Sequence, residues 1–366
     1  MAADAIRIQL LPARLGDCIL VECVRPGRDP WRLLVDGGPP DTWPLLQQRL
    51  AGLAADGQGV DVAVVTHIDS DHIGGIVPLL TNPAARGLLR EVWFNGEPQL
   101  PQRPRSVDQG EDVGDGIAAA HGRPALPWNA AFGGRAVDVG NAGGFLELDV
   151  PNGPHVTVLS PTPERLTALS QKWQQALMAA NTPHDRERDV DTPAPLHDLT
   201  LLAAKPSVND DSTPNGSSIA LLLEHRGASV LLGADAFGSV LTAGLTALAR
   251  HRGLEVLNVD AVKVPHHGSR ANVSRALVKA VPARHYLVST NGDTFHHPDD
   301  EAIARIVVGA PTGATLWFNY RTPRTARWDD AALRAEHGYT VRYPEDDMNG
   351  VVLTLRARAG SPRSAG

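Results

Sequence analysis

The sequence predicts an α/β fold in which two β-sheets pack face to face with helices on both outer sides, a four-layered αβ/βα sandwich. The first observation is that short apolar runs typical of strands alternate with helical runs along most of the chain. The second is an internal repeat. The interval from Asp36 to His67 is 31 residues, and the interval from Asp235 to His266 is also 31. Two such intervals indicate two equivalent halves.

Each half of this repeat contains the same predicted elements. A strand leads to the aspartate, a helix follows, and a second strand leads to the histidine. That second strand opens on Asp61 in the first half and on Asp260 in the second, six residues before the histidine in both. Two halves packed face to face would bring His67 and His266 to opposite walls of one cleft, at one rim of the sandwich.

The remaining elements can be placed in order along the chain. Turn residues such as Gly, Pro and Asp separate the apolar runs and give their approximate ends. We expect strands over residues 6–11, 18–24, 31–35, 60–65, 91–94, 155–159, 219–224, 229–232 and 259–264. We expect helices over residues 41–54, 73–80, 163–180 and 237–250, with further alternation to about residue 355 and one domain over residues 1–355.

Two segments interrupt the alternation of strand and helix. Residues 95–141 are rich in Pro, Gly, Arg and Asp without an apolar period, which indicates an inserted lid or rim anchored by Trp128 and Phe132. Residues 181–198 are polar and aperiodic, which indicates a second exposed loop. The tail over residues 356–366 is predicted to be disordered.

Composition excludes several classes of protein. Of the 366 residues, 42% are hydrophobic, enough for a sizeable core. The formal net charge of −7 argues against a general polyanion binder. Residues 261–366, however, carry 14 basic and 10 acidic side chains, so nucleic acid would be bound through this basic C-terminal surface.

The chain also lacks the signals of a secreted or membrane protein. The N-terminus does not resemble a signal peptide, and no apolar run approaches the roughly 18 residues of a membrane span. Cys18 and Cys23 are five positions apart in one predicted strand, on opposite faces, so we expect no disulfide between them. We expect a soluble, cytoplasmic protein without a membrane partner; the oligomeric state is not indicated.

The stretch from Thr66 to Gly75 carries most of the chemistry. It places two histidines and two carboxylates, at His67, Asp69, Asp71 and His72, in six positions directly after a buried strand. Imidazole and carboxylate are the ligand types that suit zinc, manganese or iron. Gly74-Gly75 lets the backbone fold back under this cluster. The sequence therefore predicts a metal site at the end of this strand.

The pattern His-x-Asp-x-Asp-His-x-Gly-Gly resembles the signature of the metallo-β-lactamase superfamily, whose fold is the αβ/βα sandwich. Most members carry histidine where this chain has Asp69. That variant is similar to the extracellular nuclease domain of the competence channel (ComEC type) and to phosphorylcholine esterases of related fold. Residues 264–269, with His-His-Gly-Ser, and residues 291–298, ending in His-Pro, resemble elements of the ComEC-type branch. The Gly16-Asp17 turn resembles a Gly-Asp turn that is common in this branch. We expect this turn to have a structural role.

The resemblance implies two divalent cations, Zn²⁺ or Mn²⁺, that share a bridging hydroxide. By the family pattern the ligands fall into three groups: His67 and Asp69 on the first ion, Asp71, His72 and His266 on the second, and Asp235 as the bridge. The strand that gives familiar relatives a third histidine ends here in Ser160-Pro161. The first ion is therefore expected to have few protein ligands.

The same motifs suggest catalytic and supporting residues. Asp71 is counted as catalytic as well as a ligand. His267 is expected to point away from the ions, toward substrate phosphate or as a proton donor, and His297 is expected to protonate the leaving group. Asp36 is expected to orient the loop of His67 by hydrogen bonds. Residues before the second hairpin are expected to line the cleft: Asn215, Ser217 and Ser218.

These motifs favour a di-metal phosphodiesterase, with a nuclease acting on DNA or RNA as its preferred form. Similar proteins also occur in bacterial anti-phage gene clusters. A hydrolase of a small ester, such as a phosphorylcholine ester, a cyclic nucleotide or a lactone, is the alternative that net acidity and the 95–141 insertion favour. The missing third histidine motivates another alternative, a non-catalytic regulatory module stabilised by metal.

Overall fold

The computed structural model describes residues 3–101, 109–118, 124–140, 145–180, 193–346 and 348–357. In this part of the chain the strands form two sheets. The first has the order β14-β1-β2-β3-β4-β5, with β1 Ala5–Leu10, β2 Ile19–Arg25, β3 Arg28–Val35, β4 Val60–Val65, β5 Leu89–Phe94 and β14 Val351–Arg356. The second has the order β13-β12-β11-β10-β9-β8-β7-β6, with β6 Glu147–Asp149, β7 His155–Ser160, β8 Ala220–His225, β9 Ala228–Leu232, β10 Val259–Lys263, β11 Ala283–Val288, β12 Thr315–Phe318 and β13 Thr340–Arg342.

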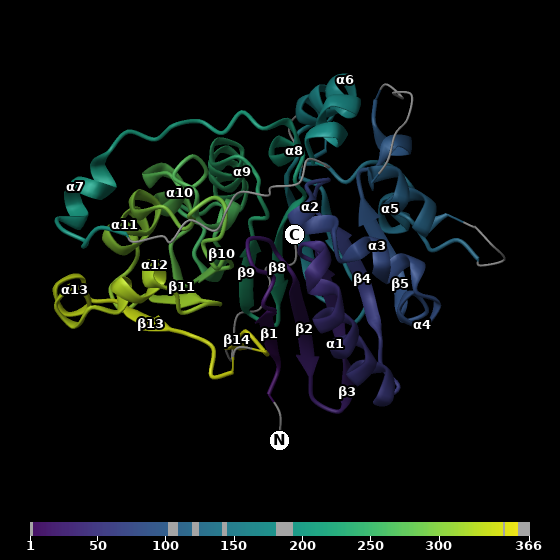
Figure 1. Ribbon diagram of the computed structural model, residues 1–366, viewed down its shortest axis with the longest axis horizontal. Helices are drawn as coiled ribbons and strands as arrows, with labels where there is room; N and C mark the ends of the chain where they lie inside the picture. Colours follow the sequence, from purple (N-terminus) through teal and green to yellow (C-terminus); the bar gives the residue numbers. More distant parts are fainter. Residues whose placement is uncertain are drawn as a thin grey trace.

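Helices lie outside both sheets (Figure 1). Those of the first half are α1 Trp43–Ala55, α2 Ser70–Ile73, α3 Ile76–Thr81, α4 Pro83–Arg86 and α5 Gln109–Ile117. Those that follow are α6 Pro163–Ala180, α7 Leu199–Ala204, α8 Thr213–Gly216, α9 Gly238–His251, α10 Arg275–Ala280, α11 Asp300–Gly309, α12 Pro323–Ala326 and α13 Ala331–His337. Short 3-10 turns cover Pro40–Thr42, Glu97–Gln99, Ala130–Phe132, Pro265–Gly268 and Arg327–Asp329. None of the described helices is both long and apolar enough to cross a membrane.

Strand β4 shows how the apolar runs build the layers. Val62 and Val64 point into the core between the two sheets, whereas Ala63 and Val65 pack into the core beneath α1 and α3. Successive side chains of a strand point to opposite faces, so a strand buried on both sides reads as a continuous apolar run. A further core lies between the second sheet and the helices α9 to α11. The predicted four-layered αβ/βα sandwich is confirmed.

The internal repeat corresponds to matching contacts in the two sheets. Strands β3 and β4 are parallel, as are β9 and β10. Asp61, at the start of β4, accepts a hydrogen bond from the Arg32 N–H at 2.8 Å. Asp260, at the start of β10, accepts one from the Ser229 N–H at 2.9 Å. The two strands therefore end at corresponding places, and each delivers a histidine-bearing loop to the same rim.

The described parts of residues 95–141 differ from the prediction of an aperiodic segment, since they include helix α5. Val113 and Ile117 of that helix are fully buried in the core of the first half. Trp128 and Phe132 anchor the segment as expected: Trp128 Nε1 donates to Phe94 O at 2.8 Å, and the Phe132 ring contacts Trp93 at 4.9 Å. Trp128 thus lies beside β5, at the outer edge of the first sheet, whereas the Val139 N–H donates to Pro161 O after β7.

Two other predictions fall wholly or partly outside the described residues. In the loop predicted over residues 181–198, only 193–198 are described, and they form neither helix nor strand. In the tail predicted over residues 356–366, only 356 and 357 are described. The cysteines behave as predicted, because Cys18 and Cys23 are both buried and free.

Candidate metal centre

Asp36 fixes the loop that follows β4. It is fully buried and adopts a left-handed backbone conformation with φ of 58°. Its carboxylate accepts hydrogen bonds from the Thr66 N–H at 2.8 Å, from the Thr66 hydroxyl at 2.7 Å and from His72 Nδ1 at 2.8 Å. The Gly37 N–H also donates to His72 O at 2.8 Å. This is the orienting role expected for Asp36 from the sequence.

The loop after β10 places two adjacent histidines in left-handed conformations. The φ values are 47° for His266 and 53° for His267. Residues other than glycine and asparagine rarely adopt this conformation, which costs about 1–2 kcal/mol for each. The His266 N–H donates to Ala234 O at 2.9 Å, and His267 Nδ1 donates to Ser289 O at 2.7 Å. The surrounding chain therefore holds both imidazole rings in positions that a regular turn would not give.

The four imidazoles of these loops share one arrangement. Each Nδ1 lies within hydrogen-bonding distance of an oxygen atom, which leaves each Nε2 available for another contact. The pairs are His67 with Thr66 Oγ1 (3.0 Å), His72 with Asp36 Oδ2 (2.8 Å), His266 with Asn272 Oδ1 (2.9 Å) and His267 with Ser289 O (2.7 Å). Histidines that bind a metal through Nε2 are oriented in this way.

Asp235 lies where three of the imidazoles converge. Its Oδ2 atom is 3.5 Å from His72 Nε2 and 3.7 Å from His266 Nε2. Its Oδ1 atom is 3.6 Å from His267 Nε2. The carboxylate therefore links the first half of the chain to both histidines of the second.

Asp71 and Asp69 add carboxylates from the first half. Asp71 Oδ2 lies 3.6 Å from His72 Nε2 and 3.7 Å from His267 Nε2, and Asp69 Oδ2 lies 3.5 Å from His67 Nε2. Hydrogen bonds are shorter, at about 2.7–3.2 Å. Ligands of a tetrahedral cation at about 2.0–2.2 Å from the metal are roughly 3.3–3.6 Å from one another. The separations in this cluster suit ligands around a cation.

Unpartnered buried atoms test whether a metal fits. The atoms His67 Nε2, His72 Nε2, His267 Nε2 and Asp235 Oδ1 are buried and have no hydrogen-bond partner. Buried polar atoms normally have one. A compact candidate metal group is also present, in which one ligand-type atom from each residue lies within 4.8 Å of the others: Asp17, His72, Asp235 and His267. The donor set and its unpartnered buried atoms fit a divalent cation.

The carboxylates determine the charge of the imidazoles nearest to them. Burial opposes the charged form of His72, but the neighbouring carboxylates, led by Asp235, outweigh it and raise the pKa of His72 well above its ordinary value. Burial also opposes the charge of Asp235, yet the surrounding imidazoles hold its pKa well below the ordinary value. Burial raises the pKa of Asp71. Without a metal, a proton on His72 balances the ionised Asp235.

The two adjacent histidines of the second half differ in charge. For His266, the carboxylates of Asp235 and Asp210 outweigh burial and raise the pKa to about 9. For His267, burial lowers the pKa well below the ordinary value, and the nearby ammonium group of Lys263 adds to this effect. His266 is therefore protonated at neutral pH, whereas His267 is neutral and its Nε2 is a free electron-pair donor.

These pKa shifts predict that the metal-free protein loses stability as the pH rises from about 6.5, the ordinary histidine pKa, to about 9. A histidine whose pKa is raised by folding stabilises the folded state below its unfolded-state pKa. That contribution disappears as the pH rises through the folded-state pKa. For His266 alone the loss is about 3 kcal/mol, because each pKa unit corresponds to about 1.4 kcal/mol.

Urea unfolding of chelator-treated protein at pH 6.5 and pH 9 measures this effect. A His266→Gln variant is the control, since its free energy of unfolding should change less between the two pH values. Equal free energies of unfolding for the wild type at both pH values would contradict the prediction.

The structure brings together seven side chains that the sequence singled out, but it corrects the orientation of one. The expectation that His267 points away from the ions is wrong, because its Nε2 faces Asp71 and Asp235. His266 lies nearer the solvent, with 24% of its side chain exposed. The convergent side chains are His67, Asp69, Asp71, His72, Asp235, His266 and His267.

The other predicted residues lie around this cluster. The His297 ring is 5.3 Å from the His266 ring. Asn215 Nδ2 lies 3.4 Å from His266 Nδ1. The Ser217 hydroxyl instead donates to Pro214 O at 2.7 Å, and the residue is 2% exposed, so its side chain closes the turn of α8 rather than lining a cleft. The Ser218 side chain is fully buried.

Sequence reasoning missed two aspartates beside the histidines. Asp210 Oδ2 is 3.3 Å from His266 Nδ1 and accepts hydrogen bonds from Asn215 and Asn272. It stands in a polar loop with nothing in the sequence to distinguish it from its neighbours. Asp17 Oδ1 is 3.6 Å from His267 Nδ1. The Gly16-Asp17 turn had been singled out in the sequence, but only a structural role was expected for it, and not a position beside a histidine of the cluster.

Comparison with known proteins agrees with this fold. The family model described as the metallo-beta-lactamase superfamily matches residues 12–293. Curated proteins provide no match. Among solved structures, the chain is similar to a CmlA beta-hydroxylase mutant, with 13% identity over 97% of this chain and 54% of that chain and a TM-score of 0.41. It is similar to Zn(2+)-bound PqqB from Methylobacterium extorquens, with 13% identity over 95% of this chain and 100% of that chain and a TM-score of 0.40. It is also similar to a diphosphatase from the PhnP family, with 15% identity over 95% of this chain and 88% of that chain and a TM-score of 0.38.

The chain thus spans about half the length of the CmlA protein, 54%. The family match alone shows the family, because it covers far more than half of the chain. It includes both histidine-bearing loops and the aspartates between them, from Pro12 to Asp293. On this evidence the chain belongs to the metallo-β-lactamase superfamily.

Proposed function

We propose that the protein is a divalent-metal-dependent phosphodiesterase and that its substrate is DNA or RNA. The observation that carries the proposal is the convergence of imidazole and carboxylate groups from both halves of the chain around Asp235. His72 is fully buried, whereas 28% of the Asp69 side chain and 24% of the His266 side chain are exposed. A substrate can therefore approach from the side of Asp69 and His266.

The residues divide naturally into a buried and an outer group. Asp71, His72 and His267 surround the buried position, and Asp235 contacts two of these three side chains. The outer group consists of the partly exposed Asp69 and the buried His67 that it faces, with His266 facing Asp235 from the solvent side. A bound pair of divalent cations, Zn²⁺ or Mn²⁺, would supply Lewis acidity, lower the pKa of water and neutralise phosphate charge.

His297 is better suited to bind phosphate than to protonate a leaving group. Burial and the neighbouring imidazoles of His266 and His267 lower the pKa of His297 well below its ordinary value. It is therefore neutral at pH 7 and holds little of the acidic form that a leaving group requires. A neutral imidazole still donates one hydrogen bond, and we assign it that role toward substrate oxygen.

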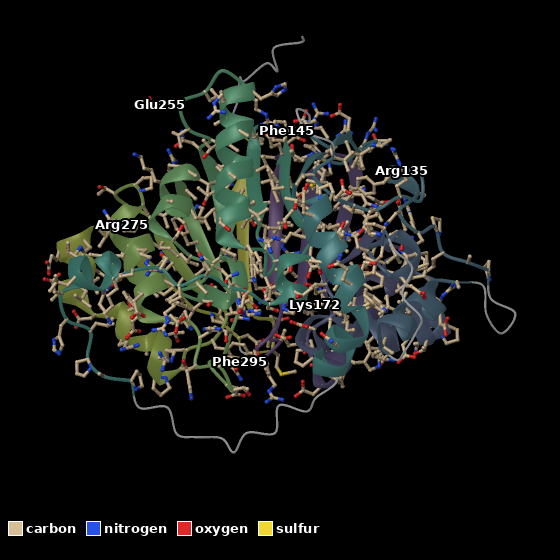
Figure 2. All side chains as sticks on the ribbon, turned by 90° about the horizontal axis from the view of Figure 1, so that it is seen from above. Arg135, Phe145, Lys172, Glu255, Arg275 and Phe295 are labelled. Carbon is tan, nitrogen blue, oxygen red and sulfur yellow. The ribbon has the colours of Figure 1, made fainter. Side chains whose placement is uncertain are left out.

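Phe295 and Arg324 support a nucleic-acid substrate. Phe295 is 45% exposed and its ring stacks on the His297 ring at 6.2 Å with an angle of 22° between the planes. Figure 2, a view from above Figure 1, shows Phe295 near the boundary between the two halves. The positive charge of Arg324 acts on His297 as well. A stacking surface and a cation beside the site suit a nucleotide base and a phosphate.

Hydrolysis assays test the proposal directly. With Mn²⁺ or Zn²⁺, the wild-type protein is expected to cleave single-stranded DNA and bis-p-nitrophenyl phosphate. The Asp71→Ala variant is expected to be at least about 10³-fold slower, because it loses a carboxylate from the buried group. If the wild type cleaves neither substrate faster than the variant does, the proposal fails.

The same assays address the two alternative functions. Cleavage of p-nitrophenylphosphorylcholine, a cyclic nucleotide or a lactone without cleavage of DNA or RNA would identify a small-ester hydrolase. Trp128, in the insertion that favoured this class, packs beside β5. Less than one metal ion per chain together with no activity would favour a regulatory module.

A further inference from the structure

An ion pair lies buried between the two halves of the chain, behind the metal centre. Asp17 belongs to the turn between β1 and β2, and Lys263 is the last residue of β10. Lys263 Nζ donates to Asp17 Oδ2, and the two side chains are 0% and 1% exposed. A Cβ atom on Gly16 would lie 1.7 Å from Asp71 O, so this turn is pressed against the loop that carries Asp71.

The second oxygen of Asp17 faces His267. Asp17 Oδ1 is buried, has no hydrogen-bond partner and lies 3.6 Å from His267 Nδ1. The Nδ1–H group donates to Ser289 O at 2.7 Å, and the Ser289 hydroxyl donates to Gly16 O at 2.9 Å. The aspartate therefore lies behind the ring, on the side opposite the Nε2 atom that faces Asp71. One ligand-type oxygen of Asp17 also lies within 4.8 Å of those of His72 and Asp235, but its position on the Nδ1 side of His267 leads us to assign it to the support of this ring.

The opposite histidine of the buried group has a similar neighbour. Asp36 Oδ2 accepts a hydrogen bond from His72 Nδ1 at 2.8 Å. Each of the two buried imidazoles thus has an aspartate on its Nδ1 side, one from each of two turns in the first sheet. At His72 the hydrogen-bonded carboxylate fixes the ring plane and keeps the proton on Nδ1, which leaves Nε2 for a metal. At His267 the Ser289 carbonyl accepts that proton, and Asp17 adds a negative charge 3.6 Å from the same nitrogen.

Lys263 explains how Asp17 can be placed there. A lone buried carboxylate costs several kcal/mol, and a buried ion pair is seldom the most stable way to fill a core. The cluster already contains the carboxylates of Asp71 and Asp235. An additional unpaired carboxylate would add negative charge to this cluster, whereas the ammonium group of Lys263 cancels that charge. The pair thus keeps a carboxylate behind the ring without adding net charge to the cluster.

We propose that Asp17 and Lys263 form a positioning pair that sets the metal affinity of the buried site by holding His267. This inference rests on the metal centre of the proposed function. The pair also joins the first sheet to the second next to the ligands, so it fixes the distance between the ligands that each half supplies.

The best test removes both charges together. The Asp17→Asn/Lys263→Met variant leaves neither partner of the pair as an unpaired charge, so we expect it to fold with stability near that of the wild type. Competition with a chelator is expected to show that the variant binds Zn²⁺ about 10–100-fold more weakly, the usual effect of losing a partner of a metal-binding histidine. The Co²⁺ absorption spectrum should change as well, because the geometry around His267 changes.

A matched pair elsewhere in the chain provides the control. Glu22 and Arg32 are 8% and 5% exposed and pair at 2.8 Å within the first sheet, through β2 and β3. The Glu22→Gln/Arg32→Met variant is expected to keep wild-type affinity for Zn²⁺ whatever its stability. Wild-type Zn²⁺ affinity in the Asp17/Lys263 variant would overturn the inference, as would an equal loss in the control. Failure of the wild type itself to bind Zn²⁺ would overturn the proposed function and this inference with it.

Discussion

Replacing Asp235 with asparagine is expected to reduce kcat/KM for phosphodiester hydrolysis by at least about 10³-fold, equivalent to roughly 4 kcal/mol of transition-state stabilisation. Asp235 offers both oxygens to the centre, one toward His267 and one toward His72 and His266. Its low pKa keeps the carboxylate ionised in a buried site. Asparagine supplies one neutral oxygen, and its NH₂ group cannot bind a metal ion. The carboxylate that would be shared by the two cation positions is therefore lost.

The measurement is steady-state hydrolysis of bis-p-nitrophenyl phosphate together with metal content per chain. Asp260→Asn is a matched control, because Asp260 opens the strand that leads to the same site and accepts hydrogen bonds from the Ser229 N–H and hydroxyl at the opposite end of that strand. The control should lose stability and keep its metal and its kcat/KM. Asp235→Asn with metal content and kcat/KM within about tenfold of the wild type would refute the assignment of a bridging role.

The repeat predicted the architecture because it reflects how the backbone is paired. Asp61 and Asp260 accept hydrogen bonds from the neighbouring strand at equivalent places, so equal sequence intervals translate into equal positions at the rim. The order of apolar runs along the chain was sufficient to predict the four-layered sandwich. Helix α5 was missed because its sequence, Gln-Gly-Glu-Asp-Val-Gly-Asp-Gly-Ile, contains three glycines and only two large apolar residues. Those two residues are buried against the first half, and tertiary packing outweighs its weak helix propensity.

The residues of the candidate site were predicted, but not the direction of every side chain. A motif with two adjacent histidines gives no information on which ring turns inward. That choice depends on two successive left-handed residues and on the carbonyl of Ser289, which is far away in sequence. Asp17 and Asp210 were missed as partners of the histidines for the same reason, since only the folded chain brings them within 4 Å of those rings.

The two adjacent histidines are expected to differ sharply when each is replaced by alanine. His267 contributes a neutral, buried Nε2 atom that faces both Asp71 and Asp235, so His267→Ala removes one donor of the buried group. We expect it to lose the buried metal and at least about 10³-fold in kcat/KM. His266 is partly exposed and its Nε2 faces only Asp235 Oδ2 among the contacts described. His266→Ala is expected to keep the buried metal and lose about 10–100-fold in kcat/KM.

Metal content and kcat/KM measured on both variants decide which of the two imidazole rings binds the buried metal. The comparison is internally controlled, because the substitutions are adjacent, remove the same group and start from the same left-handed backbone conformation. A general disturbance of the loop would affect both variants alike. If His266→Ala loses the metal while His267→Ala retains it, the motif-based assignment of His266 is correct and the orientation of His267 in the folded chain has another purpose. If only His267→Ala loses it, the buried ring is the ligand, and His266, held by Asn272 and Asp210, acts from the substrate side.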